Sequence, residues 1–372
     1  MTKNGLLHIL RRMYWHKEHG TICPADYFLG IVGEGYSRAV RELACSFGLE
    51  KAFVPSGELF TKSTSLVISK SAFRELVLRE GRRVEMAIRQ RRYGPNWTWE
   101  DCTDRTIITG ADGVMVPTVT ETQKRKRRET EARKRTEEGR RSTRRPGRPR
   151  KGADGDYKEF KLVSFYDPDK SHKYAVGTSG NHHALGRIMR REARKIGIDQ
   201  ADLSYSVTDG AEWIAKQYAA QLPMLDLNIL DYYHLRDHVI AASHVLYGEG
   251  TKQSVSWREE MLELAWNRGS LVMLDKLGNY VRRHRSGVKH DALKSLRAYV
   301  AKRVAMTDYP TFREAGYDCG SGPTESFCGC LTRRLKGRGM RWDRDHAESI
   351  MALGSLYYSN LWNDYWQTQH AA

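Results

Sequence analysis

Three acidic residues lie far apart in the sequence but in contexts that suit metal-dependent chemistry. Asp112 falls within an apolar, β-branched stretch, Asp209 lies just past a strand predicted at 203–207, and Glu325 follows a glycine-rich turn. Carboxylates are hard oxygen ligands for Mg²⁺, which keeps coordination positions for water and phosphate oxygens. Two such ions about 3.5–4 Å apart can activate a water and stabilise the leaving oxygen of a phosphodiester. We therefore predict these three residues as catalytic metal ligands, with Mg²⁺ as cofactor and Mn²⁺ as its substitute.

Each of these residues also has an ordinary structural explanation. Asp112 and Asp209 both precede glycine, and an Asp before Gly is usually a turn residue. Asp231 and His234 are three residues apart, so they share a face if their segment is helical. His234 could orient a phosphate or donate a proton, and is the fourth catalytic candidate. A structural hydrogen-bonded pair explains the same spacing.

The segments around the acids predict an α/β domain. Strands are expected at 105–117, 159–166, 174–178, 203–207 and 227–230, and helices at 182–196 and 211–222. An antiparallel meander followed by βαβ units is the topology of an RNase H-like domain. In that topology the strand that holds Asp112 and the strand that ends at Asp209 are neighbours, so their carboxylates converge. Glu325 would then come from a helix packed beside the sheet.

The remaining segments are expected to be helical, which divides the chain into four parts. Residues 1–100 form a helical region, with helices at 36–47, at 59–66 and after a Ser69 cap. Residues 101–234 form the first part of the RNase H-like core, 235–315 an all-helical insertion, and 316–372 the C-terminal helices of the core. The tryptophans of that last part, Trp342, Trp362 and Trp366, are predicted to lie in the core.

The charge of the chain points to a polyanionic partner. The 372 residues carry 62 Lys and Arg against 45 acids, a net charge of +17, and this balance is most often found in nucleic-acid-binding proteins. With 40% hydrophobic residues the chain can bury a core, which excludes a disordered protein. No run of about 18 apolar residues occurs, so we expect no membrane span. Six scattered cysteines favour a reducing, cytoplasmic location.

Much of this charge is concentrated in residues 124–151. The segment holds 15 Lys and Arg against 4 Glu, a net of +11, and Ala132 is its one apolar side chain besides proline. It is therefore expected to be a solvated insert at a hairpin, with an exposed helix over 124–141 supported by Glu–Arg pairs four residues apart. Arg145, Arg148 and Arg150 belong to a Gly-Arg-Pro sequence that resembles an AT-hook, which would place arginine in a narrow minor groove. A generic phosphate-binding tail is the alternative.

Two further patterns invite a functional interpretation. The helices on either side of residues 67–69 resemble a helix-turn-helix, in which the second helix would carry arginines into a major groove. Those residues are Arg74, Arg79, Arg82 and Arg83. An ordinary helical bundle with solvated arginines explains them equally well. Cys328 and Cys330, with Cys319 nearby, lack a second Cys or His pair at zinc-site spacing, so we do not predict a zinc site.

Four sequence blocks are specific in their order and spacing. They are GADGVMVP at 110–117, VTDGAEWI at 207–214, LDYYHLRDHV at 230–239, and GSGPTESF at 320–327 followed by RRLKGRGMRW at 333–342. With them the chain resembles bacterial insertion-sequence transposases of the Asp-Asp-Glu class, near the Mutator-like branch. Residues 20–92 more loosely resemble the helical region that precedes the catalytic domain in such proteins.

The resemblance implies a metal-dependent strand transferase whose triad is Asp112, Asp209 and Glu325. Asp231 and His234 match a D-x-x-H element of these relatives, and 235–315 matches their insertion domain. It also implies double-stranded DNA as partner, both element ends and target, a homo-oligomer on DNA and a place at the bacterial nucleoid. Three residues of the fourth block are further candidates for DNA binding: Arg333, Arg334 and Arg341.

Three functions remain open from the sequence. The first is a transposase that nicks DNA at element ends, after which the freed 3′-OH attacks target DNA. The second is a catalytically silent DNA-binding descendant, favoured because relatives often begin with a cysteine-rich zinc segment while only Cys23 lies in the first 40 residues. The intact acidic triad favours the enzyme. The third is a structure-specific nuclease, since one fold supports several functions.

Overall fold

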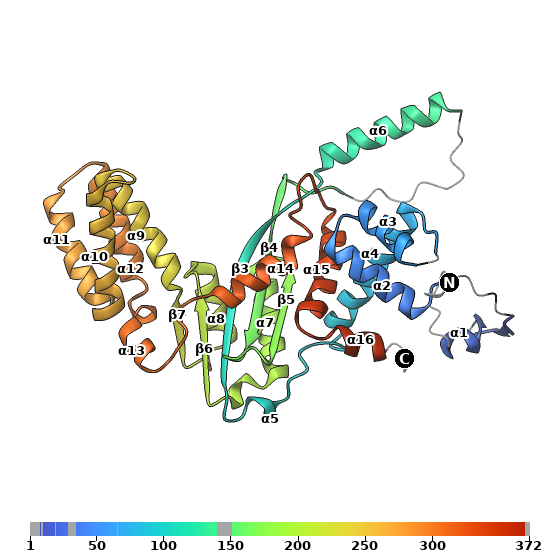
Figure 1. Cartoon of the computed structure of the whole chain (residues 1–372), viewed down its shortest axis with the longest axis horizontal. Helices are drawn as coiled ribbons and strands as arrows, with labels where there is room; N and C mark the ends of the chain where they lie inside the picture. Colours follow the sequence, from blue (N-terminus) through green and yellow to red (C-terminus); the bar gives the residue numbers. More distant parts are fainter. Residues whose placement is uncertain are drawn as a thin grey trace.

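The computed structural model describes residues 8, 10–18, 20–28, 35–64, 66–139 and 151–368. A central sheet lies between two groups of helices, which gives the molecule an elongated shape (Figure 1). Within the described ranges, no helix is long and apolar enough to cross a membrane.

The central sheet has five strands in the order β5–β4–β3–β6–β7. They are β3 (Thr106–Pro117), β4 (Tyr157–Tyr166), β5 (Lys173–Thr178), β6 (Leu203–Thr208) and β7 (Leu227–Leu230). β3, β4 and β5 pair antiparallel, while β3, β6 and β7 pair parallel. The predicted meander followed by βαβ units is therefore confirmed, and the mixed sheet is compatible with the expected RNase H-like fold.

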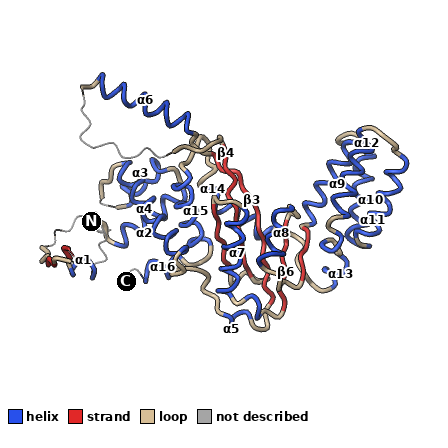
Figure 2. Tube along the Cα trace, turned by 180° about the vertical axis from the view of Figure 1, so that it is seen from behind, coloured by secondary structure: helices blue, strands red, loops and turns tan. Residues whose placement is uncertain are grey.

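Helices cover both faces of this sheet. α7 (His182–Ile196) and α8 (Glu212–Gln221) lie on one face, and α14 (Gly322–Arg333) lies on the other (Figures 1 and 2). Successive residues of a strand point to opposite faces. Accordingly the Thr109 hydroxyl contacts Tyr218 of α8 at 3.0 Å, while the next residue, Gly110, faces Thr324 of α14. The predicted helix at 182–196 is confirmed; the Asn181 side chain caps it by accepting from the Ala184 N–H.

The N-terminal helices pack on the C-terminal ones. They are α2 (Arg38–Glu50), α3 (Phe53–Ser63) and α4 (Lys70–Arg89), and they lie beside α15 (Arg344–Tyr358) and α16 (Trp362–Thr368). Ser69 caps α4 as predicted, since its hydroxyl accepts from the Ala72 N–H. The helix expected at 59–66 was misplaced, because α3 begins six residues earlier and ends at Ser63. Trp342, Trp362 and Trp366 are buried, which confirms their predicted place in the core.

Smaller elements complete this side of the molecule. A two-stranded ribbon of β1 (Tyr14–His16) and β2 (Gly20–Ile22) is followed by the short α1 (Pro24–Phe28), and α5 (Trp99–Cys102) leads into β3. The sulfur of Cys102 hydrogen-bonds the Ile196 carbonyl at 3.1 Å, which ties α5 to the end of α7.

A separate group of helices follows β7, as the sequence predicts for 235–315. Its members are α9 (Tyr232–Tyr247), α10 (Lys252–Arg268), α11 (Ser270–Arg283), α12 (Val288–Ala301) and α13 (Tyr309–Glu314). They share a hydrophobic core that includes Val239, Met261, Leu277 and Leu293. The group lies at the opposite end of the molecule from the N-terminal helices (Figure 1). Its role as a transposase insertion domain stays a prediction.

The basic insert leaves the sheet as α6 (Glu121–Glu137), a helix with no buried side chain. Hydrogen bonds join the two chain segments that flank the insert. The Glu121 N–H donates to the Ala153 carbonyl at 3.2 Å, and the Ala153 N–H donates to the Val119 carbonyl at 2.8 Å. The expected exposed helix is thus confirmed as far as 137. The AT-hook-like residues Arg145, Arg148 and Arg150 lie outside the described residues, so their assignment stays a prediction.

Candidate functional site

Asp112 and Asp209 each lie three residues beyond the last pair of the parallel β3–β6 ladder, Asp112 within β3 and Asp209 directly after β6. β3 and β6 pair Thr106 with Leu203 and continue in step to Thr109 with Ser206. Residues paired in a parallel ladder point to the same face, and neighbouring strands lie about 4.8 Å apart. The register therefore brings the two predicted catalytic aspartates together on the face that α14 covers.

A third aspartate extends this row to the next strand. β6 and β7 pair Thr208 with Leu230, and the following residues are Asp209 and Asp231. The Asp231 N–H donates to the Thr208 carbonyl at 2.7 Å, so the ladder continues to this point. One aspartate lies within β3, and one directly follows each of β6 and β7 at the same edge of the sheet. This set, Asp112, Asp209 and Asp231, is called the aspartate row below.

Glu325 reaches the same region from the first turn of α14. The Glu325 N–H donates to the Ser321 carbonyl at 3.0 Å, which fixes the start of the helix. The preceding residue, Thr324, is buried against the sheet, and its hydroxyl lies 2.9 Å from the Ser164 hydroxyl of β4. Glu325 itself remains half exposed at the edge of this contact. Its carboxylate is accessible to a ligand from solvent.

Asp231 is the most enclosed member of the aspartate row, with 1% of its surface exposed. Its Oδ1 accepts from the Tyr233 N–H at 2.6 Å, which caps α9. Its Oδ2 accepts from the Ser321 N–H at 2.8 Å and from the Ser321 hydroxyl. Since protein donors occupy both oxygens, Asp231 is better suited to joining the starts of α9 and α14 than to binding a metal.

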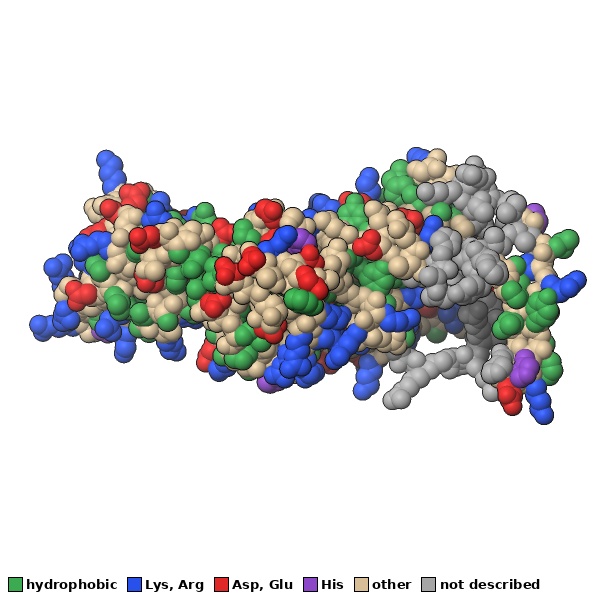
Figure 3. Space-filling view, turned by 90° about the horizontal axis from the view of Figure 1, so that it is seen from below, with side chains coloured by type: hydrophobic (Ala, Val, Ile, Leu, Met, Phe, Trp, Pro, Cys, Tyr) green, Lys and Arg blue, Asp and Glu red, His purple; other side chains and the backbone are tan. Residues whose placement is uncertain are grey.

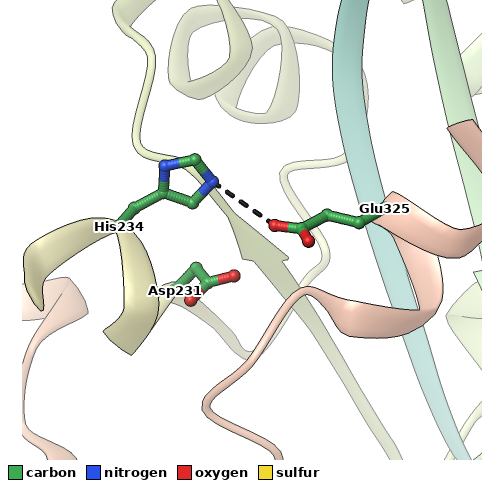
Figure 4. A group of neighbouring side chains, drawn as sticks. All are labelled: Asp231, His234 and Glu325. Atoms are coloured by element: carbon green, nitrogen blue, oxygen red, sulfur yellow. Dashed lines mark ion pairs between the residues drawn. The ribbon is translucent and has the colours of Figure 1, made fainter. Parts of the chain in front are cut away.

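His234 lies one turn into α9 and faces Glu325. Its Nε2 is 3.5 Å from Glu325 Oε1, and Figure 4 shows the two side chains pointing toward each other. Among the described His, Cys, Asp and Glu residues, the one set of three whose ligand atoms all lie within 4.8 Å of each other is Asp231, His234 and Glu325. Protein donors already occupy the carboxylate of Asp231, so His234 and Glu325 are the members of this set that can react. The imidazole of His234 can hold or transfer a proton at Nε2 beside the Glu325 carboxylate.

Burial raises the pKa of Asp112. The Gly113 N–H donates to its Oδ1 at 2.6 Å, and the Cys328 thiol also bonds to it, while the negative charge of Asp209 adds to the rise in pKa. Two carboxylates side by side repel each other, and a divalent cation relieves that repulsion. The oxygen donors of Asp112, Asp209 and Glu325 fit Mg²⁺ or Mn²⁺. The described structure does not bring these three within 4.8 Å of one another, so the predicted triad shares an edge without forming a closed ligand set.

Two residues at the end of α12, Tyr299 within the helix and Arg303 just after it, contact the turn after Asp209, and no sequence motif indicated either of them. Arg303 donates from Nε and Nη2 to the Gly210 carbonyl at 3.0 and 2.6 Å, and the Tyr299 hydroxyl donates to the Asp209 carbonyl at 3.3 Å. The guanidinium also stacks on the Tyr299 ring at 3.9 Å. These contacts fix the backbone that carries Asp209.

One predicted DNA-binding residue lies in the interior. Arg334 is 6% exposed, its Nε donates to the Gly48 carbonyl at 2.9 Å, and its guanidinium lies over the rings of Phe53 and Trp342 at 4.7 and 4.9 Å. Burial lowers the pKa of Arg334 to about 10. The prediction that it contacts DNA is therefore wrong. The neighbouring candidates Arg333 and Arg341 do lie on the surface, paired with Glu50 and Asp156.

The helix-turn-helix interpretation also needs correction. α4 is enclosed by its neighbours: a Cβ added at Gly81 would lie 2.8 Å from the backbone carbon of Ser349 in α15. Of its four candidate arginines, only Arg82 is exposed. Arg74 contacts His346 at 3.2 Å, Arg83 pairs with the buried Glu80, and Arg79 is half-buried. These contacts favour the alternative of an ordinary helical bundle for this region, and DNA binding by these arginines stays a prediction.

Comparison with known proteins adds little to this geometry. No family model matches the chain, and neither does any curated protein. Among solved structures, it is similar to the "Drosophila P element transposase strand transfer complex", with 11% sequence identity and a TM-score of 0.39, over 87% of this chain and 92% of that one. A score this low does not establish common function, which has to be argued from the site.

Proposed function

We propose that the chain is a metal-dependent DNA transposase of the Asp-Asp-Glu class. In this proposal it hydrolyses a phosphodiester at each element end and then joins the freed 3′-OH to target DNA. The proposal is supported by the β3–β6 ladder, beyond whose last pair Asp112 and Asp209 each lie three residues further along, and by α14, which packs on β3 and carries Glu325. A solvent-accessible carboxylate beside two converging ones is an arrangement that Mg²⁺-dependent phosphoryl chemistry requires.

Each residue of the site has a defined task in this proposal. When bound, Mg²⁺ supplies an activated water and stabilises the leaving oxygen. Asp112 and Asp209 would hold it through carboxylate oxygens, and Glu325 would complete the ligand set from α14. His234, whose Nε2 lies 3.5 Å from Glu325 Oε1, orients the scissile phosphate or supplies a proton at that nitrogen. Asp231 keeps α9 and α14 in register through Ser321.

The surface charge supports DNA as the substrate. α6 contributes Lys and Arg with no buried side chain, so its charge is available to phosphates. The helix continues from the β3 strand that carries Asp112. A polyanion bound by α6 is thereby brought to the same sheet as the acids.

The test is cleavage of DNA that carries the segments flanking the coding sequence, by the full-length protein with Mg²⁺ or Mn²⁺. Asp209→Asn keeps the shape of the side chain and removes its charge, so we expect cleavage and strand joining to be lost while DNA binding persists. It should also reduce the rise in melting temperature that Mg²⁺ produces, because metal binding stabilises the folded state. Asp275→Asn, an exposed position on α11, is the matched control and should behave as wild type.

The outcomes separate the three candidate functions. Cleavage with strand joining that Asp209→Asn abolishes supports the transposase. Cleavage at junctions without joining supports a structure-specific nuclease. Binding to DNA with no metal-dependent cleavage by the wild type supports a silent binding protein. Cleavage by Asp209→Asn at the wild-type rate removes the acidic site from the mechanism altogether.

A further inference from the structure

A groove lined by basic side chains runs along α7, on the sheet face opposite to Glu325. It has a volume of about 240 Å³ and is lined by Arg91, Arg187, Arg190, Arg191, Arg194 and Lys195. It is called the α7 groove below. Seen from below, Lys and Arg side chains gather near the middle of the molecule (Figure 3). Every residue that lines the groove is cationic, so it is a strongly positive surface within the described structure.

The spacing of the cations places them on one side of the helix. Positions 187, 190, 191, 194 and 195 follow the three- and four-residue steps that bring side chains onto a common helical face. Like charges at these steps repel each other and destabilise a helix. The row therefore has a folding cost, which a bound anion would remove.

Little of this charge is neutralised from within the protein. The buried Glu192 pairs with Arg191 and, at 3.2 Å, with Lys195. Arg190 donates to the Ala220 carbonyl at 3.2 Å, which leaves its charge uncompensated. Arg187 and Arg194 are exposed and form no hydrogen bond or ion pair with any residue that the structure describes. Three exposed arginines thus remain available to a ligand.

The cavity beside the α7 groove differs from it in having acidic residues in its lining. A hollow of about 530 Å³ between α4, α7 and α15 shares Arg91, Arg187 and Arg191 with the groove. Inside it, Arg89 pairs with Glu85 at 2.7 Å and with Glu348 at 3.4 Å. Two acids, Glu85 and Glu348, thus line the cavity and pair with Arg89, whereas no acid lines the α7 groove.

We propose that the α7 groove binds the phosphodiester backbone of a second DNA duplex, distinct from the one at the aspartate row. The inference takes DNA as the polymer from the proposed function. From 187 to 194 the helix rises about 10 Å, and one strand of B-DNA carries a phosphate about every 3.4 Å of axis. The row of exposed arginines therefore matches about three consecutive phosphates. Guanidinium groups suit this role because their planar fork binds phosphate oxygens in pairs.

The position of the groove favours a second duplex over the one at the aspartate row. Thr109 points toward α8, which packs beside α7, while Gly110 and the acids lie toward α14. The sheet therefore separates the α7 groove from Glu325, and helices cover both of its faces. A straight duplex seated at the aspartate row does not reach through these layers to α7.

The experiment uses full-length protein in EDTA, with random-sequence duplex DNA, so that cleavage plays no part. The groove variant is Arg187→Gln/Arg190→Gln/Arg194→Gln. The matched control, Arg282→Gln/Arg285→Gln/Lys289→Gln, removes the same charge from exposed positions around the α11–α12 turn. We measure the salt dependence of binding, and the bridging of two duplexes labelled with donor and acceptor dyes. Thermal melting confirms that each variant folds.

The groove variant should lose bridging and show a flatter salt slope. Each lost phosphate contact reduces the slope of log K against log salt by about 0.9, so three contacts give about 2.7. The control should bridge duplexes as wild type does. Equal losses in both variants would mean general electrostatic attraction and would overturn the inference. Bridging by the groove variant at the wild-type level would overturn it as well.

Two further comparisons separate a DNA groove from a site for a small phosphate, and failure of the groove assignment from failure of the proposed function. Inorganic pyrophosphate, titrated at constant ionic strength, tests whether the groove takes a small phosphate instead. Binding of pyrophosphate that the groove variant loses, with DNA bridging unchanged, refutes a DNA groove. If the wild type binds no DNA, the proposed function and this inference both fail. If the wild type binds and bridges DNA and so does the groove variant, only the groove assignment fails.

Discussion

Gly110 and Thr324 approach each other more closely than any side chain at position 110 would permit. A Cβ built on Gly110 would lie 2.8 Å from Thr324 Cβ and 2.9 Å from its Cγ2. The glycine therefore lets α14 lie directly on β3, one residue before Glu325 in the helix and two residues before Asp112 in the strand. This single contact sets how near the helix-borne carboxylate comes to the strand-borne one.

Gly110→Ala is expected to push α14 away from the sheet. Overpacking of this kind costs about 1–3 kcal/mol, and displacement of Glu325 should reduce metal-dependent cleavage more than it reduces DNA binding. Thermal melting and single-turnover cleavage measure the two effects. Gly329→Ala in the same helix is the control: no atom lies within 4 Å of its added Cβ, so it should be neutral or stabilise by about 0.5–1 kcal/mol. Equal activity of the two variants would show that the close contact does not position Glu325.

Arg303→Lys should lower the cleavage rate while leaving DNA affinity nearly unchanged. The variant keeps the positive charge but loses the fork that holds the Gly210 carbonyl through two nitrogens, so the turn behind Asp209 loosens. Lys302→Gln, an exposed neighbour, is the control for a nearby change. Single-turnover rates and binding constants are compared. A loss of affinity as large as the loss of rate would point to direct contact with DNA instead of positioning.

Asp112→Asn should melt at a higher temperature than wild type in EDTA at neutral pH. Burial and Asp209 raise the pKa of Asp112, so its charged form costs folding stability above that pKa, and the cost fades as the pH falls through it. The difference between variant and wild type should therefore shrink on acidification. Adding Mg²⁺ should stabilise wild type more than the variant. A variant that melts lower in EDTA at neutral pH would mean that the bonds from Gly113 and Cys328 outweigh the burial of charge.

Deleting 124–151 should flatten the salt dependence of DNA binding while the protein still folds. The ends of the segment are already joined by hydrogen bonds between Glu121 and Ala153 and between Ala153 and Val119, so a short connection can replace it. Six to ten phosphate contacts would cost about 10³–10⁵ in affinity between 50 and 200 mM salt. An uncharged Gly/Ser segment of equal length separates charge from length. An unchanged slope in both proteins would assign the affinity to another surface.

The sequence predicted the sheet well because its strands carry strong local signals. β7 and α7 have the predicted bounds, since apolar periodicity and an Asn181 cap act within a few residues. Local patterns could not reveal how distant segments meet. Arg334 belongs to a run that looks solvated, yet Phe53, far away in the chain, and Trp342 cover it.

The same limit applies to the candidate site. The blocks around Asp112, Asp209 and Glu325 were visible in the sequence, as was the Asp231–His234 spacing. The occupation of both Asp231 oxygens by Tyr233 and Ser321 was not, because it depends on how α14 returns to the sheet after the whole helical group. Arg303 lies in the turn after α12, in a segment with no distinguishing motif, so only its position against Gly210 identifies it.

The antiparallel pairing of β3 with β4 extends further along β3 than its parallel pairing with β6. The resulting two-stranded ribbon sets a fixed distance between Asp112 and the start of α6. Pairing with β6 ends at Thr109, but pairing with β4 continues to Pro117 opposite Tyr157. From Asp112 to Pro117 the ribbon extends about 17 Å, which is about five base-pair steps of B-DNA at about 3.4 Å each. DNA bound at the start of α6 and cut at Asp112 would therefore be cleaved at a fixed distance from its binding point. The number of residues in the ribbon would set that distance.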